Sequence, residues 1–174
     1  MSGTEKNMNK EPLAHNLSIY VANRPGALAR IAQTFSRRGF NIESLVVSAA
    51  GTNGDFSRMT ITAKGDEAGL EQVIMQCSKL VDVLACREHT DEEVVMREMA
   101  LVKLAVESSQ RSEVLQIADH FRAKSVDLTE KSMILEATGS SEKLDAMVDL
   151  LRKFKIVELV RTGKVIMARG ERET

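Results

Sequence analysis

Residues 15–48, HNLSIYVANRPGALARIAQTFSRRGFNIESLVVS, contain the pattern that decides the fold of this chain. Apolar and polar residues alternate at its start, which predicts a strand with one buried face. Apolar residues then recur at helical spacing up to Gly39, and a second alternating run begins at Asn41. The predicted order is therefore strand, tight turn, helix, strand. The apolar positions are Leu17, Ile19 and Val21 in the strand and Leu28, Ile31, Ala32 and Phe35 in the helix.

The turn between strand and helix, residues 23–26 (NRPG), admits two interpretations. Pro25 is predicted at the first helical position, where its missing N–H removes no intrahelical bond. The first N–H groups of a helix attract negative charge, and Gly26 leaves room for a carboxylate or phosphate to approach them. Asn23 adds an amide that can donate and accept. The turn is therefore either an anion-binding helix start or ordinary turn chemistry.

The rest of the first half completes a β-α-β-β-α-β order. A glycine-containing turn at residues 51–55 links two strands, the second of which alternates over residues 56–63. Acidic residues 66–67 begin a second helix, and residues 80–86 are predicted as a fourth strand. This is the order of ferredoxin-like folds, with both helices on one face of an antiparallel sheet. The second helical stripe consists of Leu70, Val73, Ile74 and Cys77.

The second half of the chain follows the same plan. Its predicted elements are a strand at 99–106, a helix with the stripe Val114, Ile117, Ala118 and Phe121, paired strands at 126–128 and 133–135, a helix with the stripe Leu144, Met147, Val148 and Leu151, a strand at 156–160 and an added edge strand at 165–167. We therefore expect an α+β protein with two ferredoxin-like domains. Its expected parts are a polar tail at 1–14, a first domain at 15–89, a linker at 90–96 and a second domain at 97–170.

Composition limits the class of protein. The 174 residues carry a net charge of −1, which gives no electrostatic reason to expect nucleic acid or an anionic membrane as partner. No apolar run is long enough to span a bilayer, and the first residues lack the apolar core of a secretory signal. Of the two cysteines, Cys77 continues a helical stripe, which indicates a buried free thiol. We expect a cytoplasmic protein.

Other functions known for such folds need residues that this sequence lacks. His15, His89 and His120 are scattered, and no carboxylate pair or nucleophile–base set stands out, which argues against an enzyme. An RNA-binding domain of this topology stacks bases on strand aromatics, but the chain has no Trp, one Tyr and five Phe. A metal sensor needs a His/Cys cluster, and the sequence contains none.

The second face and the edges of a small one-sided sheet are open, and this favours association. Pairing with a second copy covers them, and a twofold dimer is the commonest such arrangement. A monomer whose second domain covers the first meets the same requirement. The sequence pattern leaves both arrangements open.

Two stretches resemble the amino-acid-binding ACT domain: NRPGALAR at residues 23–30 and FSRRGFNIESL at residues 35–45. More narrowly, the chain resembles the small regulatory subunits of acetolactate synthase (acetohydroxyacid synthase) from about residue 17 to residue 170. The Pro-Gly-x-Leu turn is common to many ACT domains, whereas the GxNIESL run is specific to that family. Further similar stretches are SRMTI at 57–61, EQ at 71–72, KLVDV at 79–83, RE at 97–98, LVK at 101–103 and KIVE at 155–158.

The resemblance implies a regulatory chain that performs no catalysis. Chains of this kind bind a separate large catalytic subunit, which uses thiamine diphosphate, a divalent metal such as Mg²⁺, and FAD to condense two 2-oxo acids. The small chain is expected to bind no cofactor itself. It raises the activity of the large subunit and makes it sensitive to feedback inhibition by valine, in the biosynthesis of branched-chain amino acids.

The resemblance also implies an effector site at the interface of two ACT domains in a homodimer. Helix N–H groups suit the carboxylate of an amino acid, asparagine amides its ammonium, and apolar side chains its branched body. The residues implied are Asn23, Gly26, Ala27 and Leu28 of one chain with Asn41 and Ile42 of its partner. A free-standing ACT-type sensor that controls another protein would share this site. Which branched-chain amino acid binds best stays open.

Overall fold

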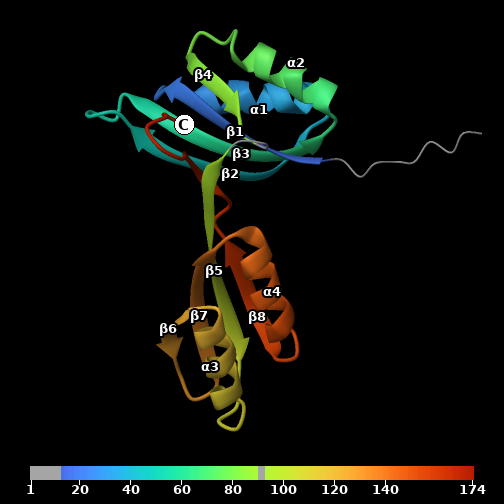
Figure 1. Ribbon diagram of the computed structural model, residues 1–174, viewed down its shortest axis with the longest axis vertical. Helices are drawn as coiled ribbons and strands as arrows, with labels where there is room; N and C mark the ends of the chain where they lie inside the picture. Colours follow the sequence, from blue (N-terminus) through green and yellow to red (C-terminus); the bar gives the residue numbers. More distant parts are fainter. Residues whose placement is uncertain (1–12, 90–92) are drawn as a thin grey trace, which may run out of the picture. The chain divides into compact units, whose positions relative to one another are not determined.

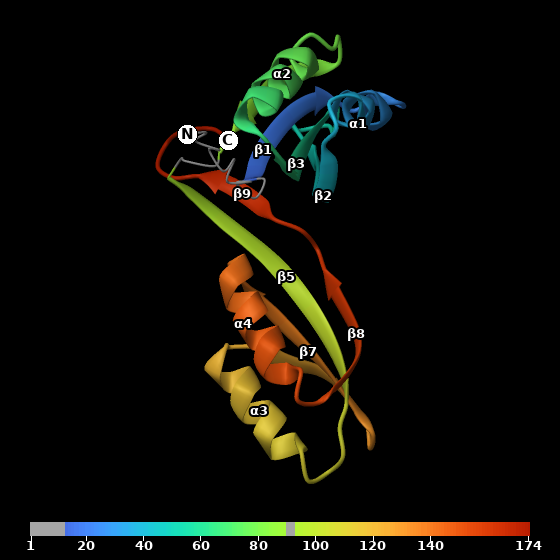
Figure 2. The ribbon, with the colours of Figure 1, turned by 90° about the vertical axis from the view of Figure 1, so that its right-hand side faces the viewer.

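The computed structural model describes residues 13–89 and 93–174. Most of the expected tail (1–12) and the centre of the expected linker (90–92) lie outside the described residues. The chain divides into two compact units, the first within residues 1–90 and the second made of residues 91–174 together with 44–47. Each unit has its own antiparallel sheet, and Figures 1 and 2 together label the elements.

The first unit contains a four-stranded sheet with two helices on one face (Figures 1 and 2). The strand order is β2-β3-β1-β4, and β1 pairs antiparallel with both β3 and β4. Its elements are β1 (Leu13–Ala22), α1 (Ala27–Arg37), β2 (Asn41–Ala50), β3 (Phe56–Gly65), α2 (Glu67–Cys77) and β4 (Val83–Glu88).

The second unit follows the same plan with strand order β6-β7-β5-β8. Its elements are β5 (Val94–Ala105), α3 (Arg111–His120), β6 (Lys124–Leu128), β7 (Ser132–Gly139), α4 (Ser141–Leu151), β8 (Lys155–Arg161) and β9 (Val165–Ala168). The predicted edge strand is confirmed as β9, which pairs with the first four residues of β5. The predicted α+β architecture of two ferredoxin-like domains is therefore confirmed.

Most residues of the predicted apolar stripes lie in the two cores, but Leu28 of the first helical stripe is 40% exposed. In the first sheet Leu17 is paired with Ile61 and Ile19 with Met59, and these four side chains are buried beneath the helices. The helices contribute Ile31, Phe35, Leu70, Val73 and Cys77, all buried. The second core includes Val102, Leu104, Val114, Leu135, Leu144, Met147 and Leu151. Both cores thus follow the sequence periods of strand and helix.

The end of α1 confirms the role predicted for Gly39. Gly39 has φ +76°, its N–H donates to Ser36 O at 3.1 Å, and the Phe40 N–H donates to Phe35 O at 3.1 Å. This pair of bonds is a Schellman motif, and its apolar contact is the edge-to-face packing of Phe35 on Phe40, with ring centroids 6.3 Å apart. The motif turns the chain directly into β2.

Several strand boundaries differ from the sequence prediction, among them the starts of β1, β5 and β4. β1 begins at Leu13, inside the expected tail, and β5 begins at Val94, inside the expected linker, because its first residues pair with β9. β4 begins at Val83 and not at residue 80, because the Leu80 and Val83 N–H groups close turns onto the Cys77 and Leu80 carbonyls. The apolar character of residues 80 and 81 suggested strand, but Val81 is 98% exposed.

The prediction that β1 has one buried face was incomplete. Asn16 and Ser18, on the face opposite the helices, are also buried. Thr62 Oγ1 donates to Asn16 Oδ1 at 3.1 Å, and Ser18 Oγ lies 2.6 Å from His89 Nε2. Buried polar atoms are tolerated because these hydrogen bonds replace those with water.

Candidate functional site

The turn before α1 differs from the predicted one. The Ala27 N–H donates to Arg24 O at 3.2 Å, and Gly26 has φ 84° and ψ −8°. These values define a type II turn with Pro25 at its second position and glycine at its third. The prediction that Pro25 is the first helical residue was therefore wrong: α1 begins at Ala27, and Gly26 is its left-handed N-cap. Both placements suit the fixed φ of proline, so only the structure distinguishes them.

The start of α1 has no electrostatic compensation from its own sequence. Gly26 provides no side-chain cap, and the first turn contains no acidic residue. The Leu28 and Ala29 N–H groups have no intrahelical carbonyl to bond, whereas the Arg30 N–H reaches Gly26 O at 3.1 Å. The helix start therefore presents two backbone donors and the positive end of its dipole, an arrangement that favours an anion.

Asn23 links the turn to the β2–β3 hairpin. Its Nδ2 donates to Gly54 O at 2.9 Å, and its backbone N–H donates to Asp55 O at 2.8 Å. The side chain is exposed, so Oδ1 is accessible as an acceptor for an ammonium group. The sequence pattern suggested that Asn23 can act as an acceptor for a ligand. Only the structure shows that Asn23 also holds the β2–β3 hairpin against the turn.

Arg30 and Asp82 were missed as parts of this end of the unit. The Arg30 guanidinium forms an ion pair with the Asp82 carboxylate, and Asp82 O accepts the Ala22 N–H at 2.7 Å. A Cβ placed on Gly26 would lie 3.1 Å from Arg30 Nη1. The guanidinium therefore lies beside the helix start, with its charge balanced by Asp82.

The structure brings together four of the six predicted site residues. Gly26 and Leu28 are exposed at the helix start next to Asn23, but the Ala27 side chain is buried in the core, so Ala27 can offer only backbone atoms. Asn41 and Ile42 begin β2. Because β2 and β1 both pair antiparallel with β3, they run parallel, and Asn41 lies at the opposite end of the sheet from Asn23. One chain therefore holds two separate halves of the predicted site.

The histidines of the first unit have structural partners. His15 Nδ1 lies 2.8 Å from Glu88 Oε1, and His89, 1% exposed, contacts the Ser18 hydroxyl. Sequence reasoning missed this Ser–His contact, because 71 residues separate its members. Its burial gives a substrate no access. Among the described residues no group of three or more His, Cys, Asp or Glu can hold a metal ion.

Cys77 and Cys86 are free thiols, as predicted for Cys77, which is fully buried. They hydrogen-bond to each other across α2 and β4. This bond lowers the pKa of Cys77, and the same bond together with burial raises the pKa of Cys86. Cys77, the thiol with the lower pKa, is the fully buried one of the two, so it is out of reach of solvent.

Comparison with known proteins assigns both units to one family. Residues 17–85 match the AHAS small subunit-like ACT domain, and residues 97–170 match the family of the small subunit of acetolactate synthase. None of the helices in residues 13–89 and 93–174 is long and apolar enough to cross a membrane.

Full-length relatives agree. The probable acetolactate synthase small subunit of Methanothermobacter thermautotrophicus is 45% identical over 163 residues, 93% of this chain and 96% of that protein. The acetolactate synthase small subunit of Mycobacterium bovis is 44% identical over 161 residues, 92% of this chain and 95% of that one. The crystal structure of the small subunit from Thermotoga maritima superposes with a TM-score of 0.82 at 37% identity, covering 91% of this chain and 99% of that chain. This chain therefore belongs to the family of acetolactate synthase small subunits, the regulatory chains of an enzyme of branched-chain amino acid biosynthesis.

Proposed function

We propose that this chain activates the large catalytic subunit of acetolactate synthase and makes it sensitive to valine, which binds at an interface between two copies of the first unit. The observation that carries the proposal is the uncapped start of α1. Its first turn has no acidic residue, and the Leu28 and Ala29 N–H groups have no hydrogen-bond partner among residues 13–89 and 93–174. Thiamine diphosphate, Mg²⁺ and FAD belong to the large subunit in this proposal. The complex works in the cytoplasm.

The separation of the two half-sites supports an assembly of two chains. Asn23 and Leu28 lie at one end of the sheet, and Asn41 and Ile42 begin β2 at the other. A twofold axis places the first end of one chain against the second end of its partner. Among the described strands β2 is an edge strand of the first sheet, so its backbone groups can take part in such an association.

The contacts proposed for valine follow from the atoms available. The Leu28 and Ala29 N–H groups bind the carboxylate. Asn23 Oδ1 accepts from the ammonium, while Asn23 Nδ2 continues to hold Gly54. The Leu28 side chain, 40% exposed, and Ile42 of the second copy contact the branched side chain.

A charge placed at the helix start tests this site. Gly26→Asp is unsuitable, because the left-handed φ of Gly26 adds strain unrelated to the ligand. Ala29→Asp adds a carboxylate in the first helical turn, where it favours the helix by roughly 0.3–1 kcal/mol. At about 4 Å from the valine carboxylate and an effective dielectric near 20, the repulsion costs on the order of 4 kcal/mol. We expect the variant to activate the large subunit and to need at least several hundredfold more valine for inhibition.

Ala29→Asn is the matched control, because it has the same shape without the charge. It should retain activation and most of the valine sensitivity. If Ala29→Asp activates and is inhibited at the wild-type valine concentration, the carboxylate does not bind at this helix start. Calorimetry of the purified chain with valine, leucine and isoleucine then ranks the effectors.

Assembly and ligand binding are linked if both chains contribute to the pocket. Sedimentation of dilute protein should show more dimer in the presence of valine. An association constant that does not change over a saturating titration would place the site within one chain.

The proposal that this chain regulates and the large subunit catalyses can be tested separately. The purified chain should make no acetolactate from pyruvate, with or without thiamine diphosphate and Mg²⁺, and should raise the rate of the cognate large subunit. Turnover by a preparation shown to be free of the large subunit would contradict the proposal.

A further inference from the structure

The three connections at one end of the first unit are tied together. The Ala22 N–H donates to Asp82 O, and Asn23 donates from backbone and side chain to Asp55 and Gly54. These bonds join the β1–α1 turn to the β2–β3 hairpin and the α2–β4 connection. The Arg30–Asp82 ion pair adds a fourth tie.

The equivalent connections of the second unit surround an open pocket. Ala105 pairs with both Ser132 and Lys155, so the β5–α3 loop, the β6–β7 turn and the α4–β8 connection meet at one end (Figure 2). The Val106 N–H donates to Lys131 O at 3.1 Å. Within the described residues, the backbone at 152–154 forms no hydrogen bond with 106–110 or 129–131. The pocket has a volume of about 530 Å³, in the range of small-molecule sites.

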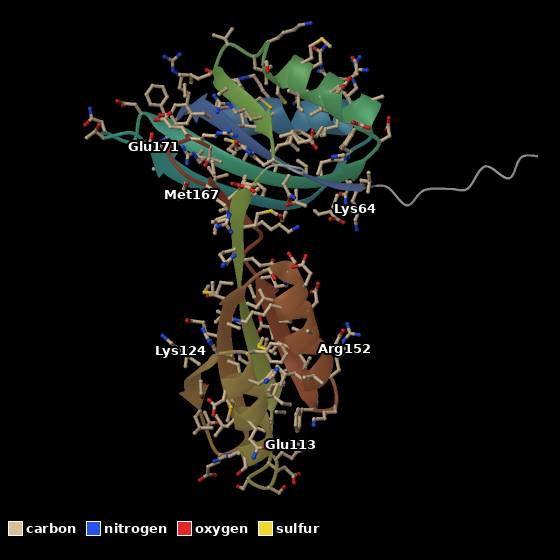
Figure 3. All side chains as sticks on the ribbon, in the orientation of Figure 1. Lys64, Glu113, Lys124, Arg152, Met167 and Glu171 are labelled. Atoms are coloured by element: carbon tan, nitrogen blue, oxygen red, sulfur yellow. The ribbon has the colours of Figure 1, made fainter. Side chains whose placement is uncertain are left out.

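The lining of this pocket combines an apolar floor with balanced charge. Val106 and Phe154 are 2% and 6% exposed and form the floor. Lys153 forms an ion pair with Glu113, which Figure 3 shows at this end of the unit. Within residues 13–89 and 93–174, the remaining charged side chains of the lining take part in no ion pair. They are Glu107, Glu130, Lys131 and Lys155.

The start of α3 opens at the same place. Gln110, part of the lining, precedes the first helical residue and gives α3 no side-chain cap. Its Oε1 accepts the Glu107 N–H at 3.2 Å, so it braces the loop and not the helix. Glu113 already places a carboxylate in the first turn of α3, so the lysines are the main partners for an anion. The pocket therefore offers ammonium groups for a carboxylate, carboxylates for an ammonium, and an aromatic floor.

We infer that this pocket binds a second small zwitterion, an α-amino acid with a short apolar side chain. Its carboxylate lies toward Lys131 and Lys155, its ammonium toward Glu107 and Glu130, and its side chain against Val106 and the edge of Phe154, since Lys153 Nζ lies over the face of that ring. The site is independent of the one at α1, since it is complete within a single chain and lies in the other unit.

Amide-resolved NMR titration of the full chain tests this inference and separates it from the effector site in the first unit. The probes are L-valine, isovalerate, which lacks the ammonium, and isobutylamine, which lacks the carboxylate. L-valine should shift the amides of 105–110, 130–131 and 153–155 in a saturable manner. Each analogue should bind there at least about tenfold more weakly, because half of the charged contacts are absent.

Variants locate the contacts. Lys131→Ala with Lys155→Ala should weaken valine binding in this pocket at least about tenfold and leave the shifts at 23–28 unchanged. Ser108→Trp, which fills the pocket without removing a charge, should abolish the shifts. Lys124→Ala is the matched control, since Lys124 is exposed on β6 outside the pocket (Figure 3).

Three results would overturn the inference: no saturable shift at 105–110, equal binding of valine and either analogue, or equal loss in Lys124→Ala. Each leaves the proposed effector site standing if the amides at 23–28 still respond to valine. Shifts at 105–110 with none at 23–28 would support this pocket and contradict the effector site.

Discussion

The two units have the same topology but differ at the end where their first helix begins. In the first unit a type II turn places a left-handed glycine before α1, and hydrogen bonds close the surrounding connections. In the second unit a longer loop leads to α3, Gln110 braces that loop, and a pocket remains open. One architecture therefore supports two kinds of helix start. The groups that each helix start presents are decided by the loops and not by the fold.

The opposite ends of the same helices are alike. α3 ends in the Schellman motif found in α1: the Arg122 N–H donates to Asp119 O at 3.0 Å and the Ala123 N–H to Ala118 O at 2.8 Å. Arg122 occupies the position of Gly39 and has φ 55°, the one positive φ of a non-glycine residue in the described chain. The helix must reverse into the next strand at this point in both units. The topology therefore requires the left-handed residue whether or not the sequence supplies glycine.

The largest expected effects come from the cores and test whether the units unfold separately. Ile61 and Leu135 are both fully buried, one in each core. Ile61→Ala and Leu135→Ala should each cost about 2–5 kcal/mol of unfolding free energy, because each leaves a cavity. Hydrogen exchange should lose protection mainly in the mutated unit. Equal loss of protection in both units would show one cooperative structure.

The next comparison uses two glycines at equivalent places, each ending the strand before the second helix. A Cβ on Gly65 would lie 2.2 Å from the Phe40 ring, whereas on Gly139 it would meet the flexible Lys143 side chain at 2.6 Å. Gly65→Ala should therefore cost about 1–3 kcal/mol. Gly139→Ala should cost less than about 1 kcal/mol, because the lysine can move. Denaturant unfolding measures both, and similar costs would mean that Phe40 relaxes as easily as Lys143.

Substitutions of the left-handed residue in the two Schellman motifs should change stability by less, and in opposite directions in the two units. Gly39→Ala forces a Cβ into the left-handed region, although the space around it is open, and should cost about 1 kcal/mol. Arg122→Gly removes the same strain in the second unit and should stabilise it by up to about 1 kcal/mol. Thermal unfolding resolves the two signs. If Arg122→Gly destabilises the protein, the arginine makes a contact worth more than its strain.

The smallest expected effect is on the pH dependence of stability. Hydrogen bonds from the Glu142 backbone and the Ser140 hydroxyl lower the pKa of the Glu142 carboxyl at the start of α4. The carboxylate therefore stabilises the fold at pH values above the pKa that Glu142 has in the unfolded chain. This contribution is lost as the pH falls through the lower pKa that Glu142 has in the folded chain. Glu142→Gln should be less stable than wild type at pH 6, by less than about 1 kcal/mol, and equal to it at acid pH. The first turn of α1 has no acidic residue, so Ala29→Gln should show no such pH dependence.

The sequence alone determined the order of the elements and most residues of both cores. Periods of two and 3.6 residues are local properties, so the positions of Leu17, Ile31, Leu70 and Leu144 in buried stripes followed directly. Gly39 was also predicted correctly, because a glycine after an apolar stripe has one common structural use. The ACT-like resemblance of residues 23–45 came from the same local stretch.

Only the tertiary structure decided the features that depend on distant residues. Pro25–Gly26 suits a helix start or a type II turn equally well by local chemistry, and the hairpin bonds of Asn23 accompany the second. The start of β4 depended on turns that expose Val81, and the buried polar pairs of β1 depended on Thr62 and His89. The separation of Asn23 from Asn41 follows from strand order, which no local period specifies. The pocket of the second unit has the same origin, since its lining comes from three connections that only folding brings together.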